Sequence, residues 1–414
     1  MTSYLRASAP RRRLVAVAAL AGILAACSSG TGTETDDRDV TTADVESVAG
    51  SAGESSTALA TTAPTGETTA PTTAAPTTAA PTTAAPTTTA PPTTLAAPSG
   101  GVFPDDEWEI GELPADDQAA LDAAVEVAFG AADATSRVRS IVVVQGGEIT
   151  YERYHPLDGP DTVMPSFSVA KSVTSAVIGL LVGDGLLDVD ERAPVDAWDD
   201  PSDPRHEITL EHLLHMASGL EWTEAYGEGS QVRQMFAADV AWEVPASASL
   251  EADPGTAFEY STGTTSILAG IATDTLGGVD AFDDYVDERL LDPLGITSIE
   301  FLTDRSGHWY GGLGADMTTR DFARFGLLYL NDGIWDGRRI LPEGWVDYSH
   351  EPSPTNPSYG AQWWMFREGA FEARGLFGQI VLVSQDHDLV IAINTTQGGD
   401  ADTLVSAAYE ALSS

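Results

Sequence analysis

A long segment near the start of the chain confines any folded domain to the residues that follow it. Residues 28–101 are mainly Thr, Ala, Pro, Ser and Gly, and residues 61–98 repeat the pattern Ala-Pro-Thr-Thr-Ala. Burial cannot offset the entropy lost on ordering such a segment, because it holds almost no large apolar side chains. Proline at this density favours extended polyproline II. We therefore expect residues 27–104 to be a disordered tether, either O-glycosylated or unmodified, and residues 105–414 to form one large domain.

The first 26 residues have the pattern of an export signal. Arg6 and residues 11–13 make a positive start, and the apolar run 14–24 is too short to span ~30 Å of hydrocarbon comfortably. The sequence Leu24-Ala25-Ala26-Cys27 then resembles the lipobox of bacterial lipoproteins, which implies cleavage before Cys27 and lipid attachment to its sulfur. We expect an exported protein, lipid-anchored on the outer side of the bacterial cytoplasmic membrane. The alternative is an ordinary secreted protein with an incidental cysteine.

Charge and cysteine content exclude several kinds of site. The chain has 63 acidic and 20 basic residues, for a formal net charge of −43. Nucleic-acid binding needs clustered Lys and Arg that neutralise phosphates, so we expect no nucleic-acid partner. A single cysteine leaves no disulfide framework and no cysteine-based metal site.

Apolar periodicity in the remaining chain predicts an α+β fold. Strand patterns lie near both ends of the domain, as hairpins over residues 141–154 and 378–394. The first turns at Gly146-Gly147 and the second at Asp386-His387-Asp388. Helical patterns cover residues 114–132, 168–182, 210–216, 261–276, 318–329, 342–348 and 400–412. This order favours an antiparallel sheet flanked by helices, with a helical insertion.

The lysine content points to a catalytic group. Of the 20 basic residues 19 are Arg, and the one lysine is Lys171. Ser168 precedes it by three residues, which on a helix places both side chains on one face. A serine hydroxyl is a weak nucleophile until a base removes its proton, and a buried lysine can lose its own proton and act as that base. The alternative is a helix N-cap followed by a lysine that reaches to solvent.

Several ordered motifs resemble one family. They are Phe167-Ser-Val-Ala-Lys-Ser-Val-Thr-Ser-Ala176, Leu213-Leu-His-Met-Ala-Ser-Gly-Leu220, Tyr260-Ser-Thr262, Gly312-Leu-Gly-Ala-Asp-Met-Thr-Thr-Arg-Asp321, Tyr359-Gly-Ala-Gln-Trp-Trp364 and Gly375-Leu-Phe-Gly-Gln379. Together they resemble the serine β-lactamase-like superfamily, which includes class C β-lactamases, penicillin-binding proteins, D-alanyl-D-alanine carboxypeptidases, esterases and 6-aminohexanoate-dimer hydrolases.

The resemblance implies a β-lactamase/transpeptidase-like fold and a role for three side chains. Ser168 corresponds to the nucleophile, Lys171 to its partner base, and Tyr260 to a proton shuttle near the serine. A tyrosine needs a nearby cation to act as a base, because its ordinary pKa is ~10. Lys171 could supply that cation. The alternative for Tyr260 is a buried aromatic with a satisfied hydroxyl.

Two positions depart from the penicillin-recognising members. Thr262 stands where β-lactamases usually carry Asn, and Ala373-Arg374-Gly375-Leu376 stands where those members have Lys-Thr-Gly or His-Thr-Gly. Arg374 could replace the missing cation and bind substrate, or it could point to solvent. The departures resemble the esterase and 6-aminohexanoate-dimer hydrolase branch. We expect the backbone N–H groups of Ser168 and Leu376 to form the oxyanion hole.

Other candidate residues have competing structural explanations. Trp222, Trp363 and Trp364 could line an acyl pocket and Glu221 could bind an amine, although core aromatics and a solvated acid are the more common outcome. The histidines at positions 212, 215 and 387 do not form a metal-binding pattern.

The sequence therefore predicts a serine hydrolase that cleaves an ester or amide bond of a small molecule through an acyl-enzyme on Ser168, without a cofactor. A second hypothesis is a D-alanyl-D-alanine carboxypeptidase or β-lactamase acting on cell-wall peptides or β-lactams. A third is a non-catalytic surface binding module. Intact Ser168, Lys171 and Tyr260 argue against the third, because a chain freed from catalysis need not keep its one lysine there.

Overall fold

The computed structural model describes residues 13–15, 102–104, 107–130, 137–367, 369–396 and 399–413. Cys27 and nearly all of the tether predicted at 27–104 lie outside the described residues. Strand β1 (Arg13–Val15) pairs in parallel with β5 and falls within the segment that the sequence predicts to be an export signal. None of the described helices combines the length and the apolar composition needed to cross a bilayer.

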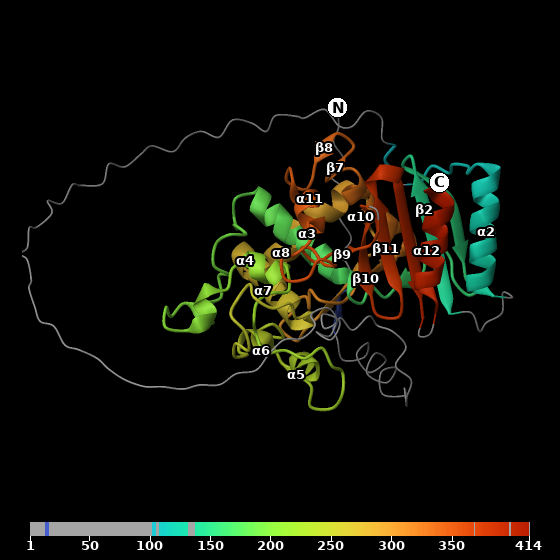
Figure 1. The fold of residues 1–414 in the computed structure, drawn as a ribbon. Coiled ribbons are helices and arrows are strands. Elements are labelled where there is room, and N and C mark those ends of the chain that lie inside the picture. The colour runs from blue at the N-terminus through green and yellow to red at the C-terminus, as the bar shows by residue number, and fades with distance from the viewer. Residues whose placement is uncertain are drawn as a thin grey trace, which may run out of the picture. The chain divides into compact units, whose positions relative to one another are not determined.

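A six-stranded antiparallel sheet organises the domain (Figure 1). Its order is β3-β2-β12-β11-β10-β9, so the first hairpin pairs with the last strand. Gly146 and Gly147 form the β2–β3 turn with φ of 63° and 80°, a left-handed conformation that glycine adopts without steric cost. Both predicted hairpins are confirmed. The strands are β2 (Val138–Gln145), β3 (Glu148–Tyr154), β9 (Trp364–Met365), β10 (Phe371–Gly375), β11 (Gln379–Ser384) and β12 (Leu389–Thr395).

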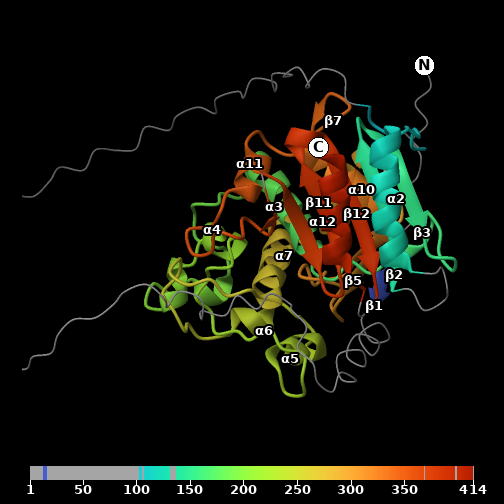
Figure 2. The same ribbon diagram turned by 45° about the vertical axis from the view of Figure 1, so that its right-hand side comes forward.

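Helices cover both faces of this sheet, because its central strands are apolar on both sides. On β2, Ile141 and Val143 pack toward α2 (Ala115–Phe129) and α12 (Ala401–Leu412). The alternate residues Val142 and Val144 face the larger core, which contains α3 (Val169–Gly183) and α10 (Thr319–Leu330). Figure 2 shows α2 and α12 on the face nearer the viewer. The α+β fold predicted from the sequence is confirmed.

The long connection between β3 and β10 carries the helical region and the smaller sheets. Here α7 (Thr262–Leu276) packs against α3 in the large core. The other helical elements are η1 (Asp196–Trp198), η2 (Pro204–Glu207), α4 (Leu210–Leu214), α5 (Gln231–Ala237), α6 (Glu243–Ala246), α8 (Val279–Val286), η3 (Asp287–Leu291), α9 (Asp292–Leu294), α11 (Trp345–His350) and, after β11, η4 (Gln385–His387). The short strands are β4 (Val163–Met164), β5 (Glu300–Thr303), β6 (Ala315–Thr318), β7 (Ile334–Trp335) and β8 (Arg338–Arg339).

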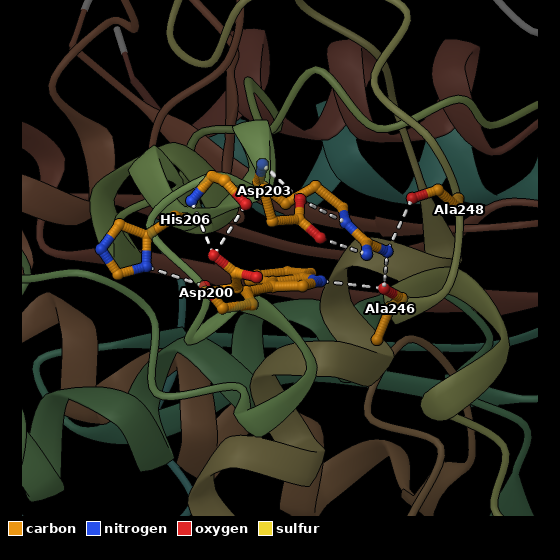
Figure 3. A network of polar contacts seen from close by, with 8 residues as sticks. Asp200, Asp203, His206, Ala246 and Ala248 are labelled. Carbon is orange, nitrogen blue, oxygen red and sulfur yellow. Dashed lines mark hydrogen bonds and ion pairs between the residues drawn. The ribbon is translucent and has the colours of Figure 1, made fainter.

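A polar network fastens the η1–η2 segment to the end of α6 (Figure 3). The Arg205 guanidinium forms an ion pair with Asp203 at 2.7 Å and donates to the carbonyl oxygens of Ala246 and Ala248. The buried Trp198 indole also donates to the Ala246 carbonyl, at 2.9 Å. These bonds satisfy carbonyls where α6 ends and anchor a region with little regular structure.

Helix boundaries differ from the predicted ones where turns intervene. The pattern over 342–348 predicts a helix, but α11 begins at Trp345, because Gly344 is left-handed with φ of 81°. The helix predicted from Ser168 begins at Val169, with Ser168 in the N-cap position. Apolar periodicity does not reveal α5, α6 or α8, since they are short.

Close packing of α10 on the sheet generates a stability prediction. A Cβ on Gly326 would lie 2.6 Å from Val390 Cγ1 and 2.9 Å from Val381 Cγ1. We expect Gly326→Ala to lower the free energy of unfolding by about 1–2 kcal/mol, since overpacking outweighs the gain in helix propensity. Urea unfolding of the full-length chain measures this.

Gly227→Ala is the matched control, because a Cβ at Gly227 meets nothing within 4 Å and needs no left-handed backbone. It should change the free energy of unfolding by less than about 0.5 kcal/mol. Equal effects from the two substitutions would contradict the packing argument.

Candidate active site

Ser168 is positioned by a bent segment between β4 and α3. Phe167 has φ of 44°, a left-handed conformation that is strained for a residue with a side chain. Ser166, one residue earlier, donates its backbone N–H and its hydroxyl to Asp316 Oδ1, at 2.8 and 3.1 Å. The Ser168 side chain lies at the N-cap position of α3 but makes no capping hydrogen bond. Its hydroxyl is therefore directed elsewhere.

Lys171 is buried beside that hydroxyl. The side chain is 1% exposed, and Nζ donates to Ser168 Oγ at 3.1 Å, Thr262 Oγ1 at 2.9 Å and the Gly312 carbonyl at 3.0 Å. Burial lowers the pKa of the Lys171 ammonium to about 8, and the negative charge of Glu224 raises that pKa in part. A lysine held in this way does not reach to solvent. The alternative of a capping serine followed by a surface lysine is wrong for this structure.

Tyr260 lies just before α7 and also approaches Lys171. Nζ of Lys171 is 4.8 Å from the centre of the Tyr260 ring, within the range of a cation–π interaction. The same ring packs against Trp364 at 5.5 Å and Tyr359 at 6.0 Å between ring centres. Lys171 thus contacts both Ser168 and Tyr260, and Trp364 belongs to the aromatic wall of this site.

Glu224 is a residue of this site that the sequence analysis does not identify. Its Oε2 accepts from the Trp222 indole and the Thr262 backbone N–H, both at 2.8 Å. Its Oε1 accepts from the Tyr226 hydroxyl at 2.9 Å and from Thr262 Oγ1 at 2.6 Å. Glu224 is 38 residues from Thr262 in sequence, so no local pattern connects them. The sequence feature that could have indicated such a partner is Thr262, which stands where β-lactamases usually carry Asn.

The turn after β10 lies against the segment that carries Ser168. A Cβ on Gly375 would approach the Ser166 carbonyl to 2.4 Å and Phe167 Cβ to 3.2 Å, so these backbones touch. The Phe167 and Phe377 rings also meet edge to face at 5.4 Å. Among the described residues, neither the backbone N–H of Ser168 nor that of Leu376 donates to an acceptor. Residues Ser168 and Leu376 are both half-buried, and Leu376 directly follows Gly375 at this contact.

The contacts of Arg374 do not support its predicted role in binding substrate. Its guanidinium pairs with Glu372 at 2.7 Å and with Asp402 at the start of α12. Strand alternation explains this: Phe371 and Ala373 of β10 face the core that contains α3, so Arg374 faces the α12 side.

Trp222, Trp363 and Glu221 have three different environments. Trp222 is 4% exposed and its indole N–H donates to Glu224. Trp222 therefore positions a residue of the site and does not line an open acyl pocket. Trp363 is fully buried among Phe325, Tyr329 and Phe371, as the core explanation predicts. The exposed Glu221 accepts from the Ser249 hydroxyl at 3.0 Å.

The histidines have structural partners. His212 forms a capping box with Thr209, and His215 lies 3.2 Å from Glu211 Oε1. Within the described part of the chain, no group of three or more His, Cys, Asp or Glu residues is placed to hold a metal ion.

The chain is similar in sequence and in fold to several known proteins. The family model described as Beta-lactamase matches residues 124–413. A 6-aminohexanoate-dimer hydrolase of Paenarthrobacter ureafaciens is 26% identical over 299 residues, which cover 64% of this chain and 74% of that protein. A Bacillus anthracis structure proposed to be a 6-aminohexanoate-dimer hydrolase superposes with a TM-score of 0.60 at 24% identity, over 76% of this chain and 88% of that one. A family VIII carboxylesterase gives 0.56 at 17%, over 73% and 99%.

The contact between Asp316 and Ser166 generates a prediction about stability and pH. Burial raises the pKa of the Asp316 carboxyl to about 6, although the hydrogen bonds from Ser166 oppose the shift. The folded chain therefore binds this proton more tightly than the unfolded chain, whose aspartates have a pKa of ~3.9. The contribution of Asp316 to the free energy of unfolding is fully present below pH ~4 and is lost as pH rises through about 6. We expect Asp316→Asn to make this dependence shallower, because asparagine accepts from Ser166 but does not ionise.

Urea unfolding of both proteins at several pH values from 4 to 7 measures the two slopes. Asp239→Asn, which removes an exposed carboxylate on the surface, is the control for a change in net charge. If Asp316→Asn and the unsubstituted chain show the same slope, the buried carboxyl does not titrate in this range.

Proposed function

The chain belongs to the beta-lactamase family and is a serine hydrolase that acts on ester or amide bonds, and from this premise we propose that it works through an acyl-enzyme on Ser168. The observation that carries the proposal is the contact between Ser168 Oγ and Nζ of the buried Lys171 at 3.1 Å. It places a base of lowered pKa within hydrogen-bond reach of a half-buried hydroxyl.

The proposed reaction begins when neutral Lys171 removes the proton of Ser168. The serine oxygen then attacks the substrate carbonyl carbon, and the resulting oxyanion is stabilised by the backbone N–H groups of Ser168 and Leu376. Neither N–H donates to an acceptor among the described residues, which supports this role. The proton passes from Lys171, with Tyr260 beside it, to the leaving oxygen or nitrogen. Water then hydrolyses the acyl-enzyme by the reverse proton transfers and frees Ser168.

We further propose that the substrate is a small linear ester or amide rather than a β-lactam or a D-alanyl peptide. The strand that carries Lys-Thr-Gly or His-Thr-Gly in penicillin-recognising members offers only Arg374 here, and that side chain is bound by Glu372 and Asp402. A substrate carboxylate would therefore lack its usual cation. The relative named as a 6-aminohexanoate-dimer hydrolase and the carboxylesterase neighbour support the same choice.

Ser168→Ala should abolish hydrolysis of p-nitrophenyl acetate and butyrate, with a loss of at least about 10³-fold, because no other group replaces the nucleophile. Intact mass of the quenched full-length protein should show an acyl adduct on the wild type and none on the variant. Thermal unfolding of the variant checks that the fold is kept. Turnover that survives Ser168→Ala would overturn the proposal. Wild-type protein that is folded but inactive on both esters would move the search to linear amides, then to β-lactams and D-alanyl peptides.

We also propose that the chain is exported and anchored through lipid on Cys27, as the segment Leu24-Ala25-Ala26-Cys27 indicates. In a bacterial host the wild type should fractionate with membranes, whereas Cys27→Ser should be released into the soluble fraction, because it has no thiol to acylate. Ser29→Ala is the control and should stay with the membranes. A wild-type chain found in the soluble fraction, with no mass added at Cys27, would contradict the anchor.

A further inference from the structure

A chain of hydrogen bonds links Lys171 to Glu224 through one hydroxyl. Lys171 Nζ donates to Thr262 Oγ1 at 2.9 Å, and Thr262 Oγ1 lies 2.6 Å from Glu224 Oε1. The shorter distance is typical of a hydroxyl that donates to a carboxylate. Thr262 is 1% exposed and its backbone N–H also donates to Glu224, so the geometry is fixed at two points.

The other donors to Glu224 use both of its side-chain oxygens as acceptors. The Trp222 indole and the Thr262 backbone N–H can only donate, and they occupy Oε2. Oε1 takes the Tyr226 and Thr262 hydroxyls. With four donors converging on two oxygens, Glu224 is held as an acceptor. The single hydrogen of the Thr262 hydroxyl therefore goes to Glu224 and is withheld from Lys171.

This direction matters once Lys171 loses its proton. A neutral amine has two hydrogens and one lone pair, and Nζ has three neighbours. The Gly312 carbonyl can only accept, so an N–H must face it. The Thr262 hydroxyl has already given its hydrogen to Glu224, so the second N–H must face Thr262. The lone pair is left to face Ser168 Oγ, which has a hydrogen to give.

We propose that Glu224 is a positioning residue that fixes the proton direction in the Thr262 hydrogen bond and so directs the lone pair of Lys171 at Ser168. Glu224 touches neither the serine nor the substrate carbonyl, and it acts through Thr262. The inference deepens the proposed function and rests on it, since it assumes that Lys171 is the base for Ser168.

Glu224 has a second, opposite effect through its charge. Its negative charge favours the Lys171 ammonium and raises the pKa of that group. The other titratable groups around the pair are Tyr260, Tyr226, Tyr359 and Glu259, and the pKa of Glu259 is itself raised by burial and by the charges of Glu251 and Glu224. Replacing Glu224 by an uncharged residue should therefore make neutral Lys171 more abundant near pH 7. The lone pair of the Lys171 amine would then no longer be directed at Ser168.

The two effects give Glu224→Gln a distinctive pH profile. For the wild type, kcat/KM for p-nitrophenyl acetate should rise with pH to a plateau, with a midpoint near the Lys171 pKa of about 8. In the variant the plateau should fall about 10- to 100-fold. The glutamine amide can donate to the Thr262 hydroxyl, and that hydroxyl can then donate its own hydrogen to the lone pair of Lys171. The midpoint should move to lower pH, because the ammonium has lost a nearby negative charge. KM should change little.

Glu221→Gln is the matched control, because it makes the same change three residues away, at an exposed carboxylate outside the hydrogen-bond chain. It should keep the wild-type plateau and midpoint. If Glu224→Gln keeps the wild-type plateau, as this control does, or if only its midpoint moves, the positioning role is wrong.

The hydroxyl of Thr262 gives an independent test should Glu224→Gln fail to fold. Thr262→Val keeps the shape but removes the hydroxyl, and Thr262→Ser restores it. We expect valine to lower the plateau about as much as Glu224→Gln does and serine to recover most of that loss. Equal activity of the valine and serine variants would overturn the inference. Hydrolysis that persists in Ser168→Ala would instead overturn the proposed function, so the two failures are distinguishable.

Discussion

A single buried ammonium sets the requirements for much of this domain. Lys171 is 1% exposed, and a charge removed from water in this way is very costly unless its hydrogens find acceptors. Its three acceptors are the Ser168 hydroxyl of the α3 N-cap residue, the Thr262 hydroxyl at the start of α7, and the Gly312 carbonyl before β6. Three segments far apart in sequence must therefore converge at one nitrogen. The packing of α3 against α7 and the return of the chain through β6 bring about this convergence.

The sheet gives this convergence a rigid support. Strands β2 and β12 join the two ends of the domain, and β10 and β11 extend that sheet to the segment before α3. At that point Gly375 lies against the backbone of Ser166 and Phe167, closer than any side chain would permit. Phe167 adopts a left-handed conformation in the same segment, and Asp316 accepts a hydrogen bond from the Ser166 backbone N–H. Ser168 is thus placed by packing rather than by a capping bond of its own helix.

Much of the fold could be predicted from the sequence, and the failures have physical reasons. The two hairpins and the long helices carry strong periodicity and turn residues, so their patterns survive in the structure with shifts of a few residues at their ends. Helix α11 starts later than predicted because the left-handed Gly344 interrupts the turn before it. The sequence does not predict the short helices α5, α6 and α8, because a helix of fewer than three turns shows too little apolar periodicity. The sequence leaves Arg374 open between substrate and solvent, whereas strand alternation in the folded sheet turns it toward Asp402.

The sequence by itself determined the chemistry of the site: a serine and the chain's one lysine at helical spacing, with Tyr260 and Thr262 in an ordered second motif. These are properties of residue identity and local spacing, which a linear chain displays directly. Only the tertiary structure decided the environment of those groups. The burial that lowers the pKa of Lys171, the turn at Leu376 and the carboxylate of Glu224 all arise from segments distant in sequence. Desolvation and hydrogen-bond direction are set by what the folded chain brings around an atom, and no local pattern of residues records them.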